Sequence, residues 1–317
     1  MGTILVTGAR GQIGSDLVAE LRRRHGRDAV LETDLHPLPN GGDALYETLD
    51  VQDRDRLASL VRTHDVETVY HLASLLSATG ERKPDLAWSV NVEGLRNVLR
   101  VARGHGLRVF WPSSIAAFGP ATPREDTPQA GPLDPVTMYG VTKVSGELLC
   151  RYAFRQDGVD VRSLRYPGLI SYAAKPGGGT TDYAVEMFYA ALRDEPYICF
   201  LRPDTRLPMM YMPDAVRATI DLMDADADAI SVRTSYNITA FSFSAEALAA
   251  ALRKRFPSFK VAYHPDFRQA IADSWPASID DRQARADWGW QPAFDLDRMV
   301  DDMIEHLAAQ LSVAEPS

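Results

Sequence analysis

The sequence predicts an α/β fold in which a doubly wound parallel sheet is followed by a smaller α/β domain. Short apolar runs, the first at residues 4–7, alternate with helices whose apolar side chains fall on one face. After Tyr166 the elements become shorter, and glycine and proline punctuate them more often. Strands that are apolar on both faces are typical of a parallel sheet covered by helices on both sides.

The elements follow from the periodicity of the apolar residues. In the first half we expect strands at 4–7, 29–34, 69–73 and 109–111, another ending at Asp50, and a sixth ending at Tyr166. Helices are expected after Gly14, around 57–61 and over 86–102. In the second half we expect helices at 182–193, 213–223, after Ser244 and from 295, with strands at 236–239 and around Val261.

Length and composition limit the domain organisation and the partners. A chain of 317 residues is expected to form about two domains. We place a nucleotide-binding domain at 1–166, with a return segment near 213–240, and a substrate-binding domain mainly at 167–317. The net charge of −9 disfavours nucleic acid or an anionic membrane as a partner, and no apolar run is long enough to span a membrane.

The two cysteines, Cys150 and Cys199, cannot make a disulfide framework, and no Cys/His spacing suggests a metal site. No signal peptide is recognisable at the start of the sequence. We therefore expect a cytoplasmic protein without a metal ion.

A glycine triplet lies between the first strand and the first helix. Gly8, Gly11 and Gly14 suit a tight turn, close approach of a pyrophosphate to the backbone, and close packing of helix on strand. The helix N-terminus behind them offers unpaired N–H groups to phosphates. A plain structural turn would also use glycine, but the strand-to-helix position favours a dinucleotide.

Asp34 ends the second strand, 20 residues after Gly14, where a carboxylate can accept hydrogen bonds from ribose hydroxyls. The same charge repels a 2′-phosphate, and neither Leu35 nor His36 is a fixed cation, so NAD is favoured over NADP. Asp50, at the end of the third strand, is expected near the adenine. A surface aspartate that merely ends a strand is the alternative for both.

Tyr139 and Lys143 lie one helical turn apart on the same helix face. A neighbouring ammonium favours the phenolate, so we expect a lowered Tyr139 pKa and a tyrosine that accepts a hydroxyl proton. Only five of the 34 basic residues are lysines, which makes a lysine at this position informative. An exposed Tyr–Lys pair without catalytic role is the alternative.

Ser113 and Ser114 follow the fifth strand, at the sheet edge that faces ligands in open parallel sheets. A hydroxyl there can hold the reacting oxygen for Tyr139. The alternative is a serine pair that caps a turn.

Together these motifs resemble the extended short-chain dehydrogenase/reductase superfamily, as do Asn91-Val92-x-Gly94 and the late Trp288-Gly289-Trp290. The resemblance implies a Rossmann-type domain, bound NAD, and a catalytic set of Ser114, Tyr139 and Lys143. The implied cofactor-binding residues are Gly8, Gly11, Gln12, Ile13, Gly14, Asp34, Asp50, Val51, Leu72, Ala73, Ser74, Asn91, Tyr139, Lys143 and Tyr166.

Several separate strings, including residues 75–81, 178–184 and 207–214, resemble the short-chain, zinc-free L-threonine 3-dehydrogenase family. That resemblance implies hydride transfer from Cβ of L-threonine to NAD⁺, giving 2-amino-3-oxobutanoate, and a glycine-rich loop before Thr180 that acts as a lid. The implied substrate-binding residues are Ser77, Ser114, Tyr139, Thr180, Thr181 and Trp275. Helix capping is the alternative for the two threonines, and core packing is the alternative for Trp275.

Two other functions stay open. A nucleotide-sugar 4-epimerase would need an asparagine after Tyr166 and a diphosphate-clamping arginine, but Gly168 and Leu207 occupy those positions. The other is a non-catalytic NAD sensor. The family resemblance also implies a homodimer through the helix near Asn91 and the helix that carries Tyr139. Leu148, Leu149 and Tyr152 would then form the apolar stripe of that interface. The alternative is that these side chains face their own core.

Overall fold

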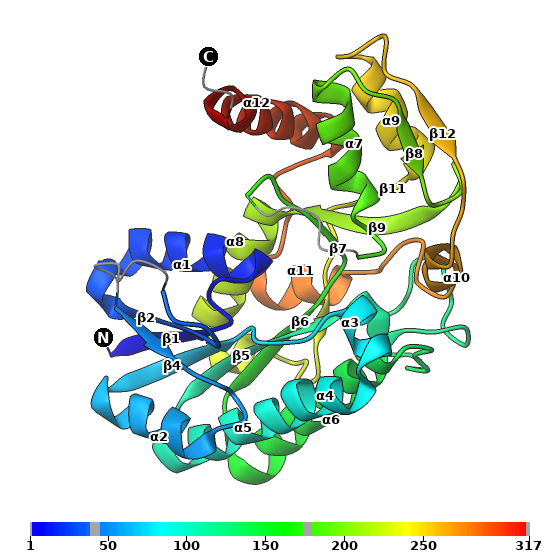
Figure 1. The fold of residues 1–317 in the computed structure, drawn as a ribbon. Coiled ribbons are helices and arrows are strands. Elements are labelled where there is room, and N and C mark those ends of the chain that lie inside the picture. The colour runs from blue at the N-terminus through cyan, green and yellow to red at the C-terminus, as the bar shows by residue number, and fades with distance from the viewer. Residues whose placement is uncertain (1, 39–44, 174–178, 315–317) are drawn as a thin grey trace.

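The computed structural model describes residues 2–38, 45–173 and 179–314, in which a seven-stranded sheet forms the larger part of the molecule (Figure 1). The strand order is β10-β6-β5-β4-β1-β2-β3, and every neighbouring pair is parallel. The predicted doubly wound parallel sheet is therefore confirmed. Its strands are β1 (Thr3–Thr7), β2 (Val30–Asp34), β3 (Tyr46–Thr48), β4 (Val66–His71), β5 (Arg108–Ser114), β6 (Val161–Tyr166) and β10 (Tyr236–Asn237).

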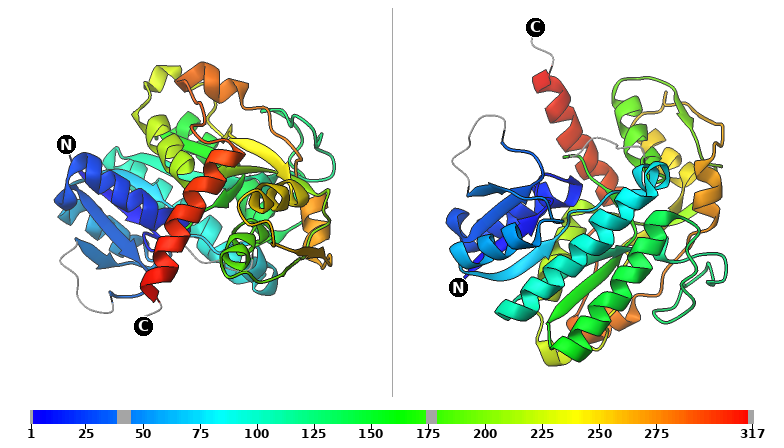
Figure 2. Two further views of the ribbon diagram at one scale, coloured as in Figure 1. Left: turned by 90° about the horizontal axis from the view of Figure 1, so that it is seen from above. Right: turned by 60° about the horizontal axis from the view of Figure 1, so that its bottom comes forward.

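Helices cover both faces of the sheet (Figure 1). They bury the apolar side chains of both faces. One face, with Val6 and Phe110, packs against α1 (Gln12–His25), α8 (Met212–Asp224) and α11 (Arg282–Trp288). The other face, with Leu5 and Val109, packs against α2 (Arg54–Thr63), α5 (Gly94–His105) and α6 (Met138–Asp157). Helices α5 and α6 run side by side over this second face (Figure 2).

The helix predicted over 86–102 is longer than expected and is not regular. It consists of α4 (Pro84–Trp88), a π-helical turn (Ser89–Glu93) and α5 in direct succession. A π turn widens the helix locally and often marks a functional segment. It contains Asn91, one of the predicted site residues.

The second half of the chain builds a smaller part above the carboxyl edge of the sheet (Figure 1). One core joins its strands and helices, with Tyr183, Phe188 and Tyr211 among the largest buried side chains. Its sheets have the orders β11-β9-β7 and β12-β8. The elements are β7 (Gly168–Ile170), α7 (Tyr183–Leu192), β8 (Tyr197–Cys199), β9 (Arg206–Tyr211), β11 (Phe241–Ser244), α9 (Ala245–Arg253), β12 (Val261–Tyr263), α10 (Arg268–Asp273) and α12 (Leu296–Ala314).

The chain returns to the large sheet after this part has begun, because α8 covers one sheet face and β10 pairs with β6 through Tyr236 and Leu164. Short helices complete the fold: α3 (Ser77–Arg82) and 3-10 turns at Arg27–Ala29, Ile115–Ala117 and Ala227–Ala229. Helices α3, α10 and α11 were not predicted from the sequence, since each is too short to show a periodic pattern.

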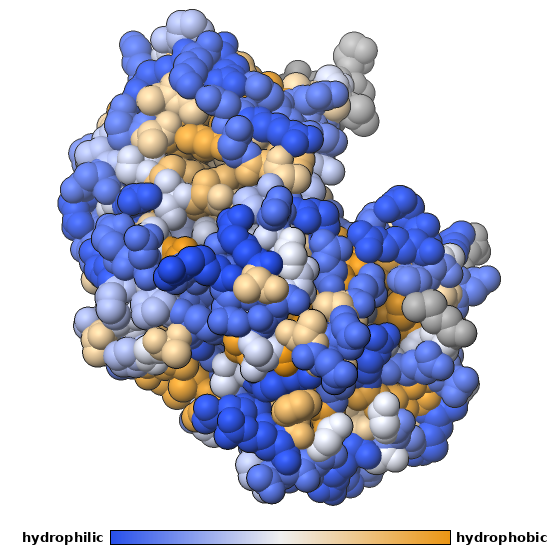
Figure 3. Space-filling view, turned by 180° about the vertical axis from the view of Figure 1, so that it is seen from behind, coloured by the Kyte–Doolittle hydropathy of each residue, from blue (hydrophilic) through white to orange (hydrophobic). Residues whose placement is uncertain are grey.

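The face seen in Figure 3 is mostly hydrophilic, with apolar residues scattered among charged ones, and it is indented between the two parts of the molecule. Among the described residues, no helix has both the length and the apolar content that a membrane span requires.

Candidate active site

A cavity of about 440 Å³ opens at the carboxyl ends of the central strands, where the sequence placed the site. This edge includes the point between β1 and β4 where the strand order reverses, which is where open α/β sheets bind ligands. Residues from both halves of the chain meet there. The predicted residues that line it are Gln12, Ile13, Leu72, Ser74, Ser77, Ser114, Tyr139, Lys143, Tyr166, Thr180, Thr181 and Trp275.

The glycine loop leaves no room for side chains. Gly8 has a φ of 65°, and a Cβ there would lie 2.7 Å from the backbone nitrogen of Ala73. A Cβ on Gly14 would lie 2.3 Å from the carbonyl oxygen of Gly8. Helix α1 begins after Gly11 without any side-chain cap, so its first N–H groups face the loop unpaired by side chains. This cradle is one that a phosphate can approach closely.

Asp34 lies beside this loop at the end of β2. Its Oδ2 accepts a hydrogen bond from the backbone nitrogen of Arg10 at 3.1 Å, and its Oδ1 accepts one from Leu35 at 2.8 Å. Asp50 instead accepts from the backbone nitrogen of Gln52 at 2.9 Å, and Val51 is buried. Neither Asp50 nor Val51 lines the 440 Å³ cavity.

Two predicted cofactor residues have side chains that are already engaged by the protein. The buried Asn91 amide exchanges two hydrogen bonds with the backbone of Leu75, at 2.8 and 3.0 Å, and donates a third to Thr142 at 3.1 Å. The buried Tyr166 hydroxyl pairs with Thr219. Asn91 therefore fixes the segment that follows β4, and Tyr166 ties β6 to α8.

Helix α6 brings Tyr139 and Lys143 to the cavity. Thr137 caps the helix by accepting a hydrogen bond from the backbone nitrogen of Gly140 at 3.1 Å. A Cβ on Gly140 would lie 2.2 Å from the carbonyl oxygen of Ala116, so the helix start rests directly on the turn after β5. The buried Lys143 ammonium lies 5.2 Å from the centre of the Tyr139 ring.

The ionisation of this pair differs from the expectation. Burial raises the pKa of Tyr139 to about 12, and a hydrogen bond from Ser114 partly opposes that rise. Burial lowers the pKa of Lys143 to about 7, and the nearby Cys150 and Glu147 only partly oppose that lowering. The predicted lowering of the Tyr139 pKa by Lys143 is therefore wrong for the chain without cofactor, because loss of hydration outweighs the neighbouring charge.

The two serines at the end of β5 face opposite sides. The Ser114 hydroxyl lines the cavity, and it also accepts a hydrogen bond from the backbone nitrogen of Ala116 at 3.2 Å. Ser114 therefore both lines the cavity and caps the turn after β5. Ser113 points the other way and donates to Glu147 at 2.7 Å.

The smaller part supplies the far wall of the cavity. Thr180 is buried there, but neither threonine caps α7, because its N-cap residue is Asp182 and no side chain makes a capping bond. The capping alternative is thus wrong. Trp275 is buried in the core of the smaller part and also lines the cavity. Of the predicted glycine-rich lid, residues 174–178 lie outside the described residues.

Sequence reasoning missed a buried ion pair behind the site. Glu147 lies one turn beyond Lys143 on α6 and is joined to Arg165 of β6, with nitrogen–oxygen distances of 2.8 and 2.7 Å. Two signals were available: the four-residue spacing from Lys143, and the two arginines within the strand that ends at Tyr166.

The chain matches known proteins along nearly its whole length. The model of the NAD dependent epimerase/dehydratase family matches residues 4–239. The chain belongs to this family. An uncharacterized epimerase/dehydratase from Staphylococcus haemolyticus is 48% identical over 312 residues, which cover 96% of this chain and 97% of that protein.

Two solved structures of the epimerase/dehydratase family are similar throughout. The holo form of a GalE-like L-threonine dehydrogenase from Cupriavidus necator is 54% identical, with a TM-score of 0.94 over 96% of this chain and 99% of that one. A monomeric L-threonine 3-dehydrogenase from a metagenome is 48% identical, with a TM-score of 0.94 over 97% of this chain and 99% of that one. The predicted superfamily resemblance is confirmed.

The residues present fit the NAD on which the epimerase/dehydratase family depends. A side chain at Gly8 would collide with the backbone of Ala73, so the loop is open to close approach by a phosphate only because glycine is there. Helix α1 begins with N–H groups that no side chain caps, and the Asp34 carboxylate accepts a hydrogen bond from Arg10 of the loop. A carboxylate at this position suits ribose hydroxyls and repels a 2′-phosphate. NAD is therefore the cofactor of this chain. In the described residues, no three His, Cys, Asp or Glu side chains gather as metal ligands would.

Proposed function

We propose that the chain is an NAD-dependent L-threonine 3-dehydrogenase of threonine catabolism. The observation that carries this is the single cavity in which Ser114, Tyr139 and Lys143 meet the hydroxyl-bearing Ser77 and Thr180. Short hydroxyl side chains suit a small zwitterion that needs several hydrogen bonds. The relatives named L-threonine dehydrogenase support the same substrate.

The roles proposed for the residues keep the predicted assignments. Ser114, Tyr139 and Lys143 are catalytic, and Ser77, Thr180, Thr181 and Trp275 complete the substrate site. The glycine loop, Asp34 and the residues after β4 bind NAD, whereas Asn91 acts by holding Leu75 in place. We also propose residues 1–166, with 213–240, as the cofactor domain, 167–317 as mainly the substrate domain, and a cytoplasmic location.

The proposed reaction removes a proton and a hydride from threonine. NAD⁺, when bound, would supply the hydride acceptor and a positive charge that favours ionisation of a phenol. Ser114 holds the substrate hydroxyl, and the Tyr139 oxygen accepts the hydroxyl proton while the hydride leaves Cβ and the C–O single bond becomes a ketone. Lys143, 5.2 Å from the Tyr139 ring centre, stabilises the phenolate. The product, 2-amino-3-oxobutanoate, is a β-keto acid that can lose carbon dioxide to give aminoacetone.

The structure disfavours the epimerase alternative through the position that a phosphate clamp would need. Leu207 is buried in β9, and the adjacent Arg206 is exposed on the other side of the strand, 3.4 Å from Glu125. No cation therefore replaces the missing clamp at that position. The sensor alternative does not account for a buried lysine beside the partly buried Tyr139, with Ser114 in the same cavity.

The test is a panel of small 3-hydroxy amino acids assayed with NAD and with NADP by the absorbance of the reduced cofactor. We expect oxidation of L-threonine, with NAD strongly preferred. Turnover of a UDP-sugar without net oxidation would instead establish the epimerase. Binding of NAD without turnover of any substrate would establish the sensor.

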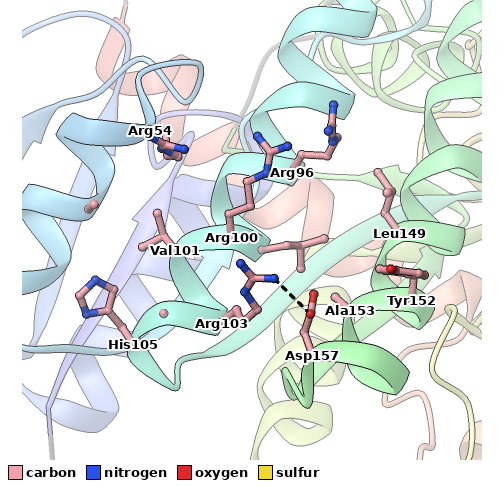
Figure 4. Close-up of a pocket in the computed structure, with 13 residues that line it drawn as sticks. Arg54, Arg96, Arg100, Val101, Arg103, His105, Leu149, Tyr152, Ala153 and Asp157 are labelled. Carbon is pink, nitrogen blue, oxygen red and sulfur yellow. Dashed lines mark hydrogen bonds and ion pairs between the residues drawn. The ribbon is translucent and has the colours of Figure 1, made fainter.

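We further propose a homodimer that forms on the outer face of α5 and α6. Leu148 and Tyr152 are exposed there by 48% and 61%, and Val141 lies about two and three turns before them on α6. A groove of about 630 Å³ separates the two helices, with Leu149 and Tyr152 on one side and Arg96 and Arg100 on the other (Figure 4). Aromatic and arginine side chains are both frequent at protein interfaces.

A further inference from the structure

Two side chains of α6, one turn apart, form hydrogen bonds to the carboxyl end of strand β5. Lys143 donates to the carbonyl oxygen of Pro112 at 2.7 Å, and Glu147 accepts from the hydroxyl of Ser113 at 2.7 Å. Ser113 precedes Ser114 on the strand, so their side chains point to opposite faces. The bond to Glu147 therefore fixes the backbone from which the Ser114 hydroxyl reaches Tyr139.

Glu147 is itself held rigidly. It is fully buried, and Arg165 binds both of its oxygens, with Nε to Oε1 at 2.8 Å and Nη2 to Oε2 at 2.7 Å. Arg165 is fixed in turn by the side chain of Asn237 at 3.0 Å and the carbonyl oxygen of Gln129 at 2.9 Å. A bidentate pair of this kind gives the carboxylate one position and one orientation.

Glu147 is also one of the few ionisable groups around Lys143. On α6 these groups are Tyr139, Glu147 and Cys150, and from β4 the charge of Lys143 acts on the buried His71. From β5 only the Trp111 ring, at 4.8 Å, and the Pro112 carbonyl oxygen meet the ammonium.

We propose that Glu147 is a positioning residue of this active site, which anchors Ser114 through Ser113 and helps to keep Lys143 charged. This proposal rests on the proposed dehydrogenase function. Burial lowers the pKa of Lys143 to about 7, and the carboxylate of Glu147, one turn away on the same helix, opposes this lowering. Loss of the carboxylate would leave a larger neutral fraction of Lys143, which cannot stabilise a phenolate.

The test compares three variants by steady-state kinetics from pH 6 to pH 10 and by thermal unfolding. Glu147→Gln removes the charge but keeps the size. Ser113→Ala removes the bond to β5 and leaves the Glu147–Arg165 pair whole. The control is Asp160→Asn, which also removes the charge of a carboxylate paired with an arginine, here Arg162 at 2.9 Å. Asp160 directly precedes the first residue of β6, whereas the cavity lies at the last residue of that strand.

We expect Ser113→Ala to lower kcat for threonine by about tenfold with little change in KM, because the reacting groups are misplaced but threonine still binds. Glu147→Gln should lower kcat at least as much. It should also move the alkaline limb of the pH profile, on which Lys143 loses its proton, to lower pH by about half a unit or more. Asp160→Asn should lower the unfolding temperature and leave both kinetic readouts unchanged.

A Ser113→Ala variant with wild-type kcat would overturn the positioning role, and this result decides the question alone if Glu147→Gln does not fold. The same kinetic losses in Asp160→Asn would also overturn it, because they would reflect general loss of stability. In both cases the wild type still oxidises threonine. A wild type inactive toward threonine would instead show that the proposed function is wrong.

Discussion

Tyr139 and Lys143 are two ionisable residues that folding removes from water together. In the chain without cofactor, burial favours the neutral form of each, so the pair does not start as phenolate and ammonium. Bound NAD⁺ would add a positive charge to this site, which favours the phenolate, the form of Tyr139 that can accept the hydroxyl proton of the substrate. We therefore expect Tyr139 to act as a base only when cofactor and substrate are bound.

Tyr139→Phe tests this role directly. We expect the rate of threonine oxidation to fall by roughly 10²- to 10⁴-fold, because the proton acceptor is lost. The affinity for NAD, measured by calorimetry, should change little, since the ring that Lys143 faces is kept. Oxidation at close to the wild-type rate would contradict the catalytic assignment.

His71 gives the fold itself a dependence on pH. Burial lowers its pKa to about 3, and the charge of Lys143 acts in the same direction. Between about pH 3 and 6.5 the unfolded chain binds a proton at His71 that the folded chain does not. Stability is therefore complete above about pH 6.5 and falls as the pH drops, by up to about 1.4 kcal/mol per pH unit.

His71→Asn should flatten this dependence when the free energy of unfolding is measured by denaturant titration from pH 4 to 7. The asparagine amide can keep the bond of Nδ1 to the Thr7 hydroxyl, which is 2.8 Å long in the wild type. The exposed His105 serves as control, and His105→Asn should keep the wild-type slope. An equal slope in both variants would exclude His71 as its source.

Helix α6 is the element on which the site depends, since it carries Tyr139, Lys143 and Glu147 on the face that packs against β5. The approach is close because Gly146 has no side chain. A Cβ at that position would lie 2.3 Å from Cη2 of Trp111. The Trp111 ring in turn covers the Lys143 ammonium.

Gly146→Ala should destabilise the chain by about 1–3 kcal/mol through overpacking and should also reduce activity, because the helix moves off the strand. Gly104→Ala on α5 is the matched control, as no atom lies within 4 Å of its added Cβ and its φ is not positive. It should stabilise the chain by up to about 1 kcal/mol. Denaturant unfolding of the two variants measures both effects, and equal destabilisation would contradict this packing argument.

For the molecule as a whole, the outer face of α5 and α6 is the surface on which we propose that the dimer forms. Leu148→Glu places a charge in the exposed apolar stripe of α6 and should convert a dimer into a 35.0 kDa monomer in sedimentation. Ile198→Glu is the control, because Ile198 is similarly exposed but lies on β8 of the smaller part. A monomeric wild type, like the metagenomic relative, would refute the dimer.

The sequence by itself determined the layered sheet and the local chemistry. Apolar runs predicted the strands of the large sheet, and four-residue repeats predicted its long helices. Short motifs predicted site roles for Gly8, Asp34, Ser114, Tyr139 and Lys143. Each of these depends only on neighbours along the chain. The tertiary structure decided what depends on distant residues: that Asn91 holds Leu75, that Glu147 meets Arg165, and that burial opposes the charge of Lys143 at Tyr139. Burial and pairing arise only when remote segments pack together, so no local pattern could determine them.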